Sequence, residues 1–350
     1  MTILGPTKKL PWSPVVSIRK LEFLLGRTRE DLRRVASRAS QYYDPFDILP
    51  HGTKTWRHID NPSKELKTLQ SRIYRAILAN YEFPSNVVGG IPGRSILDNV
   101  TPHLGTKCVI TLDISRCFPS IHDKMVFSAL RSALGFSEEV AALLTKLTTI
   151  EHRLPQGAPS SPIIANLVMR PVHRELDRIA RAFDLHWTMY VDDITLSGPR
   201  AASAVQSVVR AVQRAGFAIS HRKVHVMANS RRQSVTGVVV NRGSASAGRP
   251  RLEEIRQATL DLLERDVITE FEFRSIIGKI RYVSWIKGTQ GEALSRLADA
   301  LQPLVFNGGS RVPTFQRRPC KNYSRSHAVA CEHPPDHARS PNHVFPPAEN

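Results

Sequence analysis

The sequence contains little cysteine and no long apolar run, and both absences narrow what the protein can be. Only four cysteines occur among 350 residues, and no two of them share a CxxC spacing. Cysteine this sparse fits a reducing cytosol better than a disulfide framework. No segment approaches the roughly 18 apolar residues that a membrane-spanning helix needs, and the N-terminus lacks the apolar core of a secretory signal. We therefore expect a cytoplasmic protein with no membrane association.

Acidic residues are also few compared with basic ones. The chain has 49 Lys and Arg against 31 Asp and Glu, which gives a formal net charge of +18. This excess favours a nucleic-acid partner, because each phosphate neutralised by Lys or Arg releases condensed counterions. A basic surface without such a partner is the alternative. Hydrophobic residues make up 41% of the chain, so most of it should fold, into two or three subdomains.

Periodicity predicts helices toward both ends and strands in the centre. Apolar residues at three- and four-residue spacings indicate helices over 18–40, 63–80, 123–134 and 251–304. The β-rich runs predict strands at 108–113, 187–191, 194–198, 217–220 and 234–241. The Gly/Ser-rich segment 242–250 marks a subdomain boundary.

The last part of the chain, residues 307–350, loses periodicity and is read as a disordered basic tail. Its cysteines and histidines could ligate zinc in principle, but their spacing matches no compact zinc module. These residues are Cys320, His327, Cys331, His333 and His337.

Three carboxylates carry the chemistry that the pattern predicts. Asp113 ends the first central strand, and Asp192–Asp193 lie at the tip of a hairpin. A split β-α-β architecture places such a strand end beside the hairpin tip, where the carboxylates would repel one another unless cations lay between them. Two Mg²⁺ ions fit, since they bind oxygen ligands and nucleotide phosphates and promote phosphoryl transfer. The alternative is turn chemistry for the paired Asp and a strand-end cap for Asp113.

Four segments in a fixed order carry a resemblance to a known family. They are ITLDISRCFPSI, LPQGAPSSPIIAN, YVDD and GFAISHRK. This series resembles the palm motifs of reverse transcriptases, over roughly residues 55–300. The resemblance implies an RNA-directed DNA polymerase with an α+β right-hand fold, in which fingers, a palm (an antiparallel sheet with helices on one face) and a helical thumb follow one another. The implied boundaries are an irregular N-terminus 1–20, fingers 21–107 with part of 123–165, palm 108–241 and thumb 251–306.

The resemblance assigns roles around the carboxylates. Asp113 and Asp192 match the principal metal ligands, and Asp193 matches the second, less directly ligating Asp. The backbone of Ile114 would line the metal and triphosphate site. Phe118 would collide with a 2′-hydroxyl and so admit deoxynucleotides, although it could simply be a core aromatic.

It also implies three contacts to the nucleotide. Gln156 would pack on the incoming nucleotide, and Gly157 would permit close backbone approach. Lys223 would protonate or neutralise the pyrophosphate leaving group, unless it is a solvated strand-end lysine. Arg94 would clamp the triphosphate or, equally, contact template phosphate.

Two further segments resemble elements of the retron subgroup. Asn99 to His103 is similar to its Asn-Ala-x-x-His element, with Val100 in place of Ala. The second segment, similar to its Val-Thr-Gly motif, consists of Val235, Thr236 and Gly237. Both would contribute to RNA binding; the alternatives are a helix cap and an ordinary strand turn.

A retron-type enzyme copies a structured noncoding RNA into single-stranded DNA, using deoxynucleoside triphosphates and a 2′-hydroxyl primer. The resulting branched msDNA belongs to anti-phage defence with an accessory protein. A group II intron or phage-exclusion reverse transcriptase is the alternative within the class. From another class, the alternative is a noncatalytic RNA-binding protein on a polymerase fold.

Overall fold

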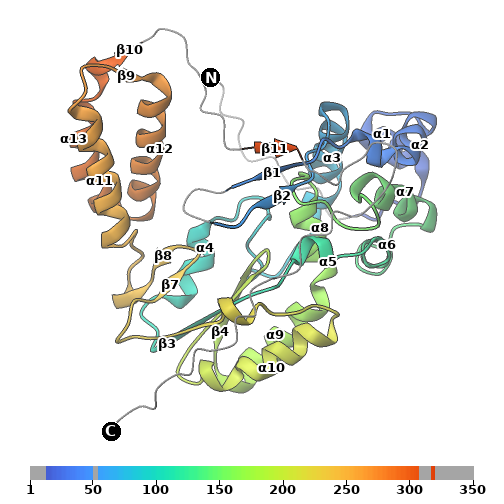
Figure 1. Ribbon diagram of the computed structural model, residues 1–350. Helices are drawn as coiled ribbons and strands as arrows, with labels where there is room; N and C mark the ends of the chain where they lie inside the picture. Colours follow the sequence, from blue (N-terminus) through green and yellow to red (C-terminus); the bar gives the residue numbers. More distant parts are fainter. Residues whose placement is uncertain (1–12, 50–53, 307–316, 320–350) are drawn as a thin grey trace, which may run out of the picture.

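The computed structural model describes residues 13–49, 54–306 and 317–319 (Figure 1). The Cys and His residues of the predicted tail, and most of the tail itself, lie outside these ranges. Within them, Arg317–Pro319 is not disordered, because it forms strand β11 and pairs antiparallel with β1 (Phe46–Ile48). Within the same ranges, no helix combines the length and the apolar character that crossing a membrane requires.

A four-stranded antiparallel sheet forms the centre of the molecule. Its strands, in the order β4-β5-β3-β6, are His186–Tyr190, Asp193–Ser197, Cys108–Asp113 and His225–Ala228. Helices α9 (Arg170–Phe183) and α10 (Ala201–Arg214) pack together on one face of this sheet (Figure 1). In β3, Ile110 and Leu112 belong to the core that these helices complete. Because side chains alternate along a strand, Asp113 faces the opposite side.

Two of the predicted strands are wrong in detail. Residues 217–220 form no regular strand: Ser220 N donates to the O of Asp113, the last residue of β3, and Ser115 N donates to Ala218 O just beyond it. The strand that pairs along β3 is β6, five residues further on. The predicted strand 234–241 is a hairpin of β7 (Ser234–Val235) and β8 (Val238–Val239), since the two residues between them have positive φ.

The N-terminal helical part lies at one side of the sheet. It contains α1 (Ile18–Leu25), α2 (Arg29–Ser37), α3 (Lys64–Ala76), α6 (Asp123–Ser132) and α7 (Glu138–Thr148). The predicted helix 18–40 is divided, because Gly26 ends α1 in the left-handed conformation and Thr28 caps α2. The irregular N-terminus ends before residue 20, since the Ser17 side chain accepts a hydrogen bond from Lys20 N and starts α1.

Shorter elements connect this part to the sheet. They are β2 (Arg57–Ile59), which pairs with β1, then α4 (Ile96–Val100), α5 (Cys117–Ser120) and α8 (Ser161–Val168). The 3-10 turns are η1 (Ala39–Tyr42), η2 (Leu78–Asn80), η3 (Thr101–His103), η4 (His221–Lys223), η5 (Asn241–Gly243) and η6 (Gln302–Leu304). Helix α8 carries a proline in its first turn, a position that proline favours.

The C-terminal helical part stands on the other side of the sheet in Figure 1 and has its own core. Its helices are α11 (Arg249–Leu263), α12 (Glu270–Ile286) and α13 (Gly288–Asp299). The predicted run 251–304 is interrupted by β9 (Ile268–Thr269), which pairs with β10 (Val305–Phe306), and by a Thr269–Glu272 capping box that starts α12. The apolar residues of β7 and β8 join this core, so the hairpin anchors the helices to the sheet.

Gly89 packs closely against the hairpin formed by β4 and β5. A Cβ on Gly89 would lie 2.5 Å from the backbone N of Val191, between β4 and β5. The segment is also fixed by bonds from Val88 N to Met189 O, 2.8 Å, and from Asn166 Nδ2 to Gly89 O, 2.7 Å. The segment around Gly89 is therefore bonded on one side to β4 and on the other to α8.

We expect Gly89→Ala to destabilise the protein by about 2 kcal/mol, because the added methyl overlaps backbone atoms that cannot move aside cheaply. The measurement is the urea midpoint of unfolding. Gly278→Ala is the matched control: the site in α12 has nothing within 4 Å of a Cβ. That change should stabilise the helix by about 0.5–1 kcal/mol. Equal midpoints for the two variants would contradict the packing described here.

Candidate active site

The three predicted carboxylates meet at one end of the sheet. In the β3–β5 ladder Asp113 lies directly opposite Asp193, and Ile114 N donates to Asp192 O at 3.0 Å. Directly paired residues of an antiparallel ladder carry their Cβ atoms about 5 Å apart on the same face. Asp192, in the turn just before β5, completes the group. The expected meeting of Asp113 with the 192–193 tip is therefore what the structure contains.

The hairpin tip is strained, and the strain does not fall on the aspartates. Val191 has φ of +62°, whereas neither Asp192 nor Asp193 has a positive φ. A β-branched residue in the left-handed region is an outlier that costs about 1–3 kcal/mol, and such strain gathers at functional sites. The turn-chemistry alternative, in which the Asp pair supplies a positive φ, does not describe this hairpin.

Burial and mutual repulsion change the titration of the carboxyls. Burial and the charge of Asp113 raise the pKa of Asp192. Burial, together with the charges of Asp192 and Asp113, raises the pKa of Asp193 to about 6. Lys223 Nζ donates to Asp113 Oδ1 at 2.8 Å and supplies one positive charge. The site therefore has more negative charge than its own residues neutralise.

The donor set fits hard divalent cations, although the protein does not form a closed cage for them. Within the described ranges, no three or more His, Cys, Asp or Glu side chains are arranged to hold a metal ion by themselves. Uncompensated carboxylate oxygens are nevertheless the ligands that Mg²⁺ prefers, and such sites take remaining ligands from substrate phosphates. Ile114 can contribute only backbone atoms, because its side chain is 1% exposed and lies in the core.

The Gln156–Gly157 loop lies against strand β2. Gln156 is half-buried, and both its backbone N and its O bond to Asp60, which follows β2. Gly157 has φ of +129°, and a Cβ there would lie 2.9 Å from Ile59 Cγ2. The glycine is thus required by packing against β2, a reason independent of any nucleotide.

Phe118 and Arg94 have different surroundings. Phe118, in α5, is half-buried against the core, which leaves part of its ring at the surface. The Arg94 guanidinium instead donates to the backbone carbonyls of Phe83, Pro84 and Val87. The Arg94 side chain ties its own loop together, and burial lowers its pKa; its contact with a triphosphate or with template phosphate stays a prediction.

The retron-like residues form a buried network in place of an exposed RNA surface. Asn99 and His103 are both 0% exposed. His103 Nδ1 lies 2.7 Å from Ser197 Oγ, and its Nε2 lies 2.8 Å from Thr188 Oγ1, so it joins β5 to β4. Burial lowers the pKa of His103 to about 3, which keeps the ring neutral. The expected direct RNA contact of these two residues is therefore corrected.

The second retron-like segment is joined to the first. Asn99 Nδ2 donates to Thr236 Oγ1 at 3.4 Å. Val235 is 0% exposed, so only Thr236, half-buried, and Gly237, exposed, present surface to a partner. Gly237 has φ of +82° and sits in the β7–β8 turn. The strand-turn alternative describes its backbone.

Sequence reasoning missed Arg57. This exposed residue of β2 is near enough to Asp192 for its charge to lower the pKa of that carboxyl. It lies one residue before His58 in the run TWRHID, where a basic residue flanked by an aromatic was the available signal. Arg57 is thus a cation at the edge of the carboxylate group that sequence reasoning did not assign to the site.

Comparison with known proteins identifies the family. The family described as reverse transcriptase (RNA-dependent DNA polymerase) matches residues 48–240. The chain belongs to the reverse transcriptase family. The Retron Ec86 reverse transcriptase of Escherichia coli is 33% identical over 235 residues, 65% of this chain and 72% of the relative. The Retron Mx65 reverse transcriptase of Myxococcus xanthus is 33% identical over 297 residues, 78% of this chain and 66% of the relative. This reverse transcriptase is of retron type, an RNA-directed DNA polymerase with the right-hand polymerase fold.

Solved structures are similar at a more distant level. A foamy viral protease–reverse transcriptase in complex with double-stranded DNA has a TM-score of 0.43 and 15% identity, covering 87% of this chain and 51% of that one. Telomerase from Candida albicans has a TM-score of 0.43 and 12% identity, covering 76% of this chain and 58% of that one.

The raised pKa of Asp193 predicts a stability change in the absence of divalent cations. A carboxyl whose pKa is about 6 when folded and about 3.8 when unfolded costs stability as the pH rises through that window, and the full cost remains above it. Asp193→Asn should therefore stabilise the metal-free protein at pH 7.5 by about 1–2 kcal/mol and have little effect near pH 4. Urea unfolding in chelator at both pH values measures this. A variant less stable than the native chain at pH 7.5 would contradict the repulsion described here.

Proposed function

We propose that this reverse transcriptase copies a structured noncoding RNA into single-stranded DNA, primed from a 2′-hydroxyl of that RNA. The observation that carries the polymerase chemistry is the meeting of Asp113, Asp192 and Asp193 at one end of the sheet. The formal charge of +18 supports binding to an RNA template and its DNA product. The choice of RNA and primer is supported by similarity to retron relatives.

We assign the parts of the molecule to the parts of a right-hand polymerase. The N-terminal helical part with β1 and β2 is the fingers, the four-stranded sheet with α9 and α10 is the palm, and α11 to α13 are the thumb (Figure 1). Fingers and thumb flank the palm face that carries the three carboxylates, so a template–primer duplex lying there would touch all three parts. RNA recognition by shape and phosphate contacts suits a surface of this size and charge.

The residues of the site divide the work of nucleotide addition. Asp113 and Asp192, with Asp193, would hold two Mg²⁺ ions, which lower the pKa of the attacking hydroxyl and stabilise charge on the phosphates. Gln156 would pack on the incoming deoxynucleoside triphosphate, and Arg57 would neutralise its phosphates from β2. Lys223 would neutralise or protonate the departing pyrophosphate, and its bond to Asp113 supports this role because it puts the ammonium beside the carboxylates.

The biological setting belongs to the same proposal. We place the enzyme in the cytoplasm, in anti-phage defence, with an accessory effector protein. The supports are the scarcity of cysteine and the similarity to retron reverse transcriptases.

Nucleic acid that copurifies with the protein should contain DNA joined to RNA, and RNase should reduce the RNA part to a short branched remnant. Treatment with a 2′–5′ debranching enzyme should then release a free DNA end. DNA that debranching leaves unchanged would contradict 2′-hydroxyl priming.

Removal of one carboxylate should separate chemistry from binding. Asp192→Asn should abolish deoxynucleotide incorporation, at least about 10³-fold, because the neutral amide is a poor ligand for a divalent cation. RNA affinity should change less than about twofold, because lysine and arginine side chains bind the RNA phosphates and the Asp192 carboxylate does not. Primer extension and filter binding on the same preparation measure the two quantities. Full synthesis by the variant would overturn the assignment of Asp192.

The half-buried ring of Phe118 should select the sugar. Phe118→Ala should raise incorporation of ribonucleotides relative to deoxynucleotides by about tenfold, because space opens for a 2′-hydroxyl. Phe118→Tyr keeps the ring and serves as the control. Competition between the two nucleotides in a single primer-extension reaction gives the ratio. An unchanged ratio in Phe118→Ala would leave Phe118 as a core aromatic only.

A further inference from the structure

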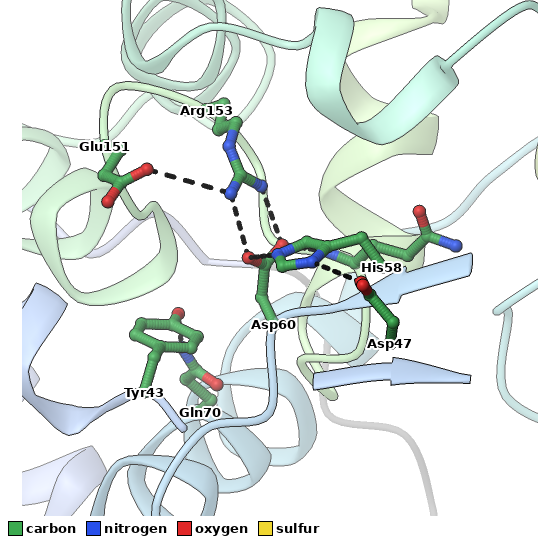
Figure 2. A network of polar contacts seen from close by, with 8 residues as sticks. Tyr43, Asp47, His58, Asp60, Gln70, Glu151 and Arg153 are labelled. Carbon is green, nitrogen blue, oxygen red and sulfur yellow. Dashed lines mark hydrogen bonds and ion pairs between the residues drawn. The ribbon is translucent and has the colours of Figure 1, made fainter. Parts of the chain in front are cut away.

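A buried carboxylate outside the catalytic group links three segments of the fingers: β1, β2 and the loop that carries Arg153 and Gln156. Asp60 is 1% exposed, and its two oxygens accept a bidentate pair of hydrogen bonds from Arg153, at 2.7 and 2.9 Å. His58 Nε2 lies 3.2 Å from Asp60 Oδ1, while His58 Nδ1 lies 3.1 Å from Asp47 in β1. Figure 2 shows these side chains converging on Asp60 from the β1–β2 hairpin and from the loop that carries Arg153.

Asp60 also holds both backbone groups of Gln156. Asp60 N donates to Gln156 O at 2.8 Å, and Gln156 N donates to Asp60 Oδ2 at 2.9 Å. The Gln156 backbone is thus fixed twice by one residue, while its side-chain amide makes no hydrogen bond with the described part of the chain. Gly157 adds a steric constraint, since a Cβ there would also lie 3.1 Å from Asp60 O. The backbone of the Gln156–Gly157 loop is therefore held in place, while the side-chain amide of Gln156 is available to a ligand.

Asp60 stays ionised although it is buried. Burial alone raises the pKa of Asp60, but the hydrogen bonds from His58 and Arg153 outweigh it and hold the pKa at about 2. A buried ion pair is weak evidence for stability, because well-packed apolar residues often serve as well. What an apolar residue could not supply is the acceptor for Gln156 N. The arrangement therefore defines a geometry more than it adds stability.

Backbone strain beside the pair agrees with a positioning role. Glu151 and His152 both have positive φ, +46° and +60°, in a two-residue turn closed by reciprocal Ile150–Arg153 backbone bonds of 2.9 Å. Neither residue is a glycine, and the left-handed conformation costs other residues about 1–2 kcal/mol each. The turn presents Arg153 to Asp60. Strained backbone persists where the surrounding contacts over-determine it.

We propose that Asp60 is a positioning residue for the incoming nucleotide: with Arg153 it locks the Gln156–Gly157 backbone against β2, the strand that also carries Arg57. Gln156 and Arg57, on two segments about a hundred residues apart in the chain, are thereby kept in one fixed relation. The inference rests on the proposed function, in which both residues meet the deoxynucleoside triphosphate. Asp60 itself touches neither the nucleotide nor the reacting atoms.

The test is steady-state primer extension by Asp60→Asn at varied deoxynucleotide concentration. Asp60 Oδ2 accepts from both Arg153 Nη1 and Gln156 N, and Oδ1 accepts from Arg153 Nη2. The variant's amide has one acceptor oxygen and an NH2 group in place of the second, so the bidentate pair with Arg153 and the bond from Gln156 N cannot both be kept. We expect KM for the deoxynucleotide to rise on the order of tenfold, while kcat at saturation and the Kd for template–primer stay within about twofold. Loss of kcat with an unchanged KM would overturn the proposal.

Tyr43→Phe is the matched control for stability. Tyr43 is buried beside the same cluster, and its hydroxyl accepts from Gln70 Nε2 at 2.9 Å without touching the Gln156 loop (Figure 2). Loss of the Tyr43 hydroxyl should lower the free energy of unfolding by about 1 kcal/mol and leave the KM for the deoxynucleotide unchanged. If both variants raise KM equally, Asp60 has only a structural role.

Failure of the two proposals can be told apart. A native chain that incorporates no deoxynucleotide contradicts the proposed function. A native chain that does so, with an Asp60→Asn variant of unchanged KM, contradicts only this inference.

Discussion

The pairing of β3 with β5 is the constraint on which the site depends. It places Asp113 opposite Asp193, with Asp192 in the adjoining turn. A slip of one residue would turn Asp113 toward the face that α9 and α10 cover, because successive side chains of a strand point to opposite faces. The correct register brings like charges together, and burial together with the charges of Asp192 and Asp113 raises the pKa of Asp193 to about 6. The fold gives up stability here in order to hold a site that attracts divalent cations.

Buried polar groups on two sides keep this pairing and its surroundings in place. His103 bridges Thr188 of β4 and Ser197 of β5, and Gly89 backs the strained Val191 between those strands. On the side of β1 and β2, Asp60 holds the loop that carries Gln156. These groups are buried. Contacts inside the protein therefore fix the positions of the carboxylates and of Gln156.

The parts that could be predicted from sequence are those with a local pattern. The strand that ends at Asp113 and the hairpin around Asp192 follow from β-rich runs bounded by turn residues. Strand β6 has mostly exposed side chains and gave no such signal, whereas the apolar run 217–220 resembled a strand but pairs only beyond the end of β3. Arg94 in its Gly-rich loop resembled an anion site, yet nearby carbonyls occupy it. Asp60 had no local signature, because Arg153, its main partner, is 93 residues away.

The most direct test of the account is to locate divalent cations in crystals grown with Mn²⁺, template–primer and a non-hydrolysable deoxynucleotide. Anomalous scattering identifies manganese independently of the protein. The account predicts anomalous density between the carboxylates of Asp113 and Asp192, within about 2.5 Å of their oxygens, with Lys223 displaced from Asp113. Density elsewhere, or an intact Lys223–Asp113 pair with no manganese beside it in the presence of nucleotide, would contradict it.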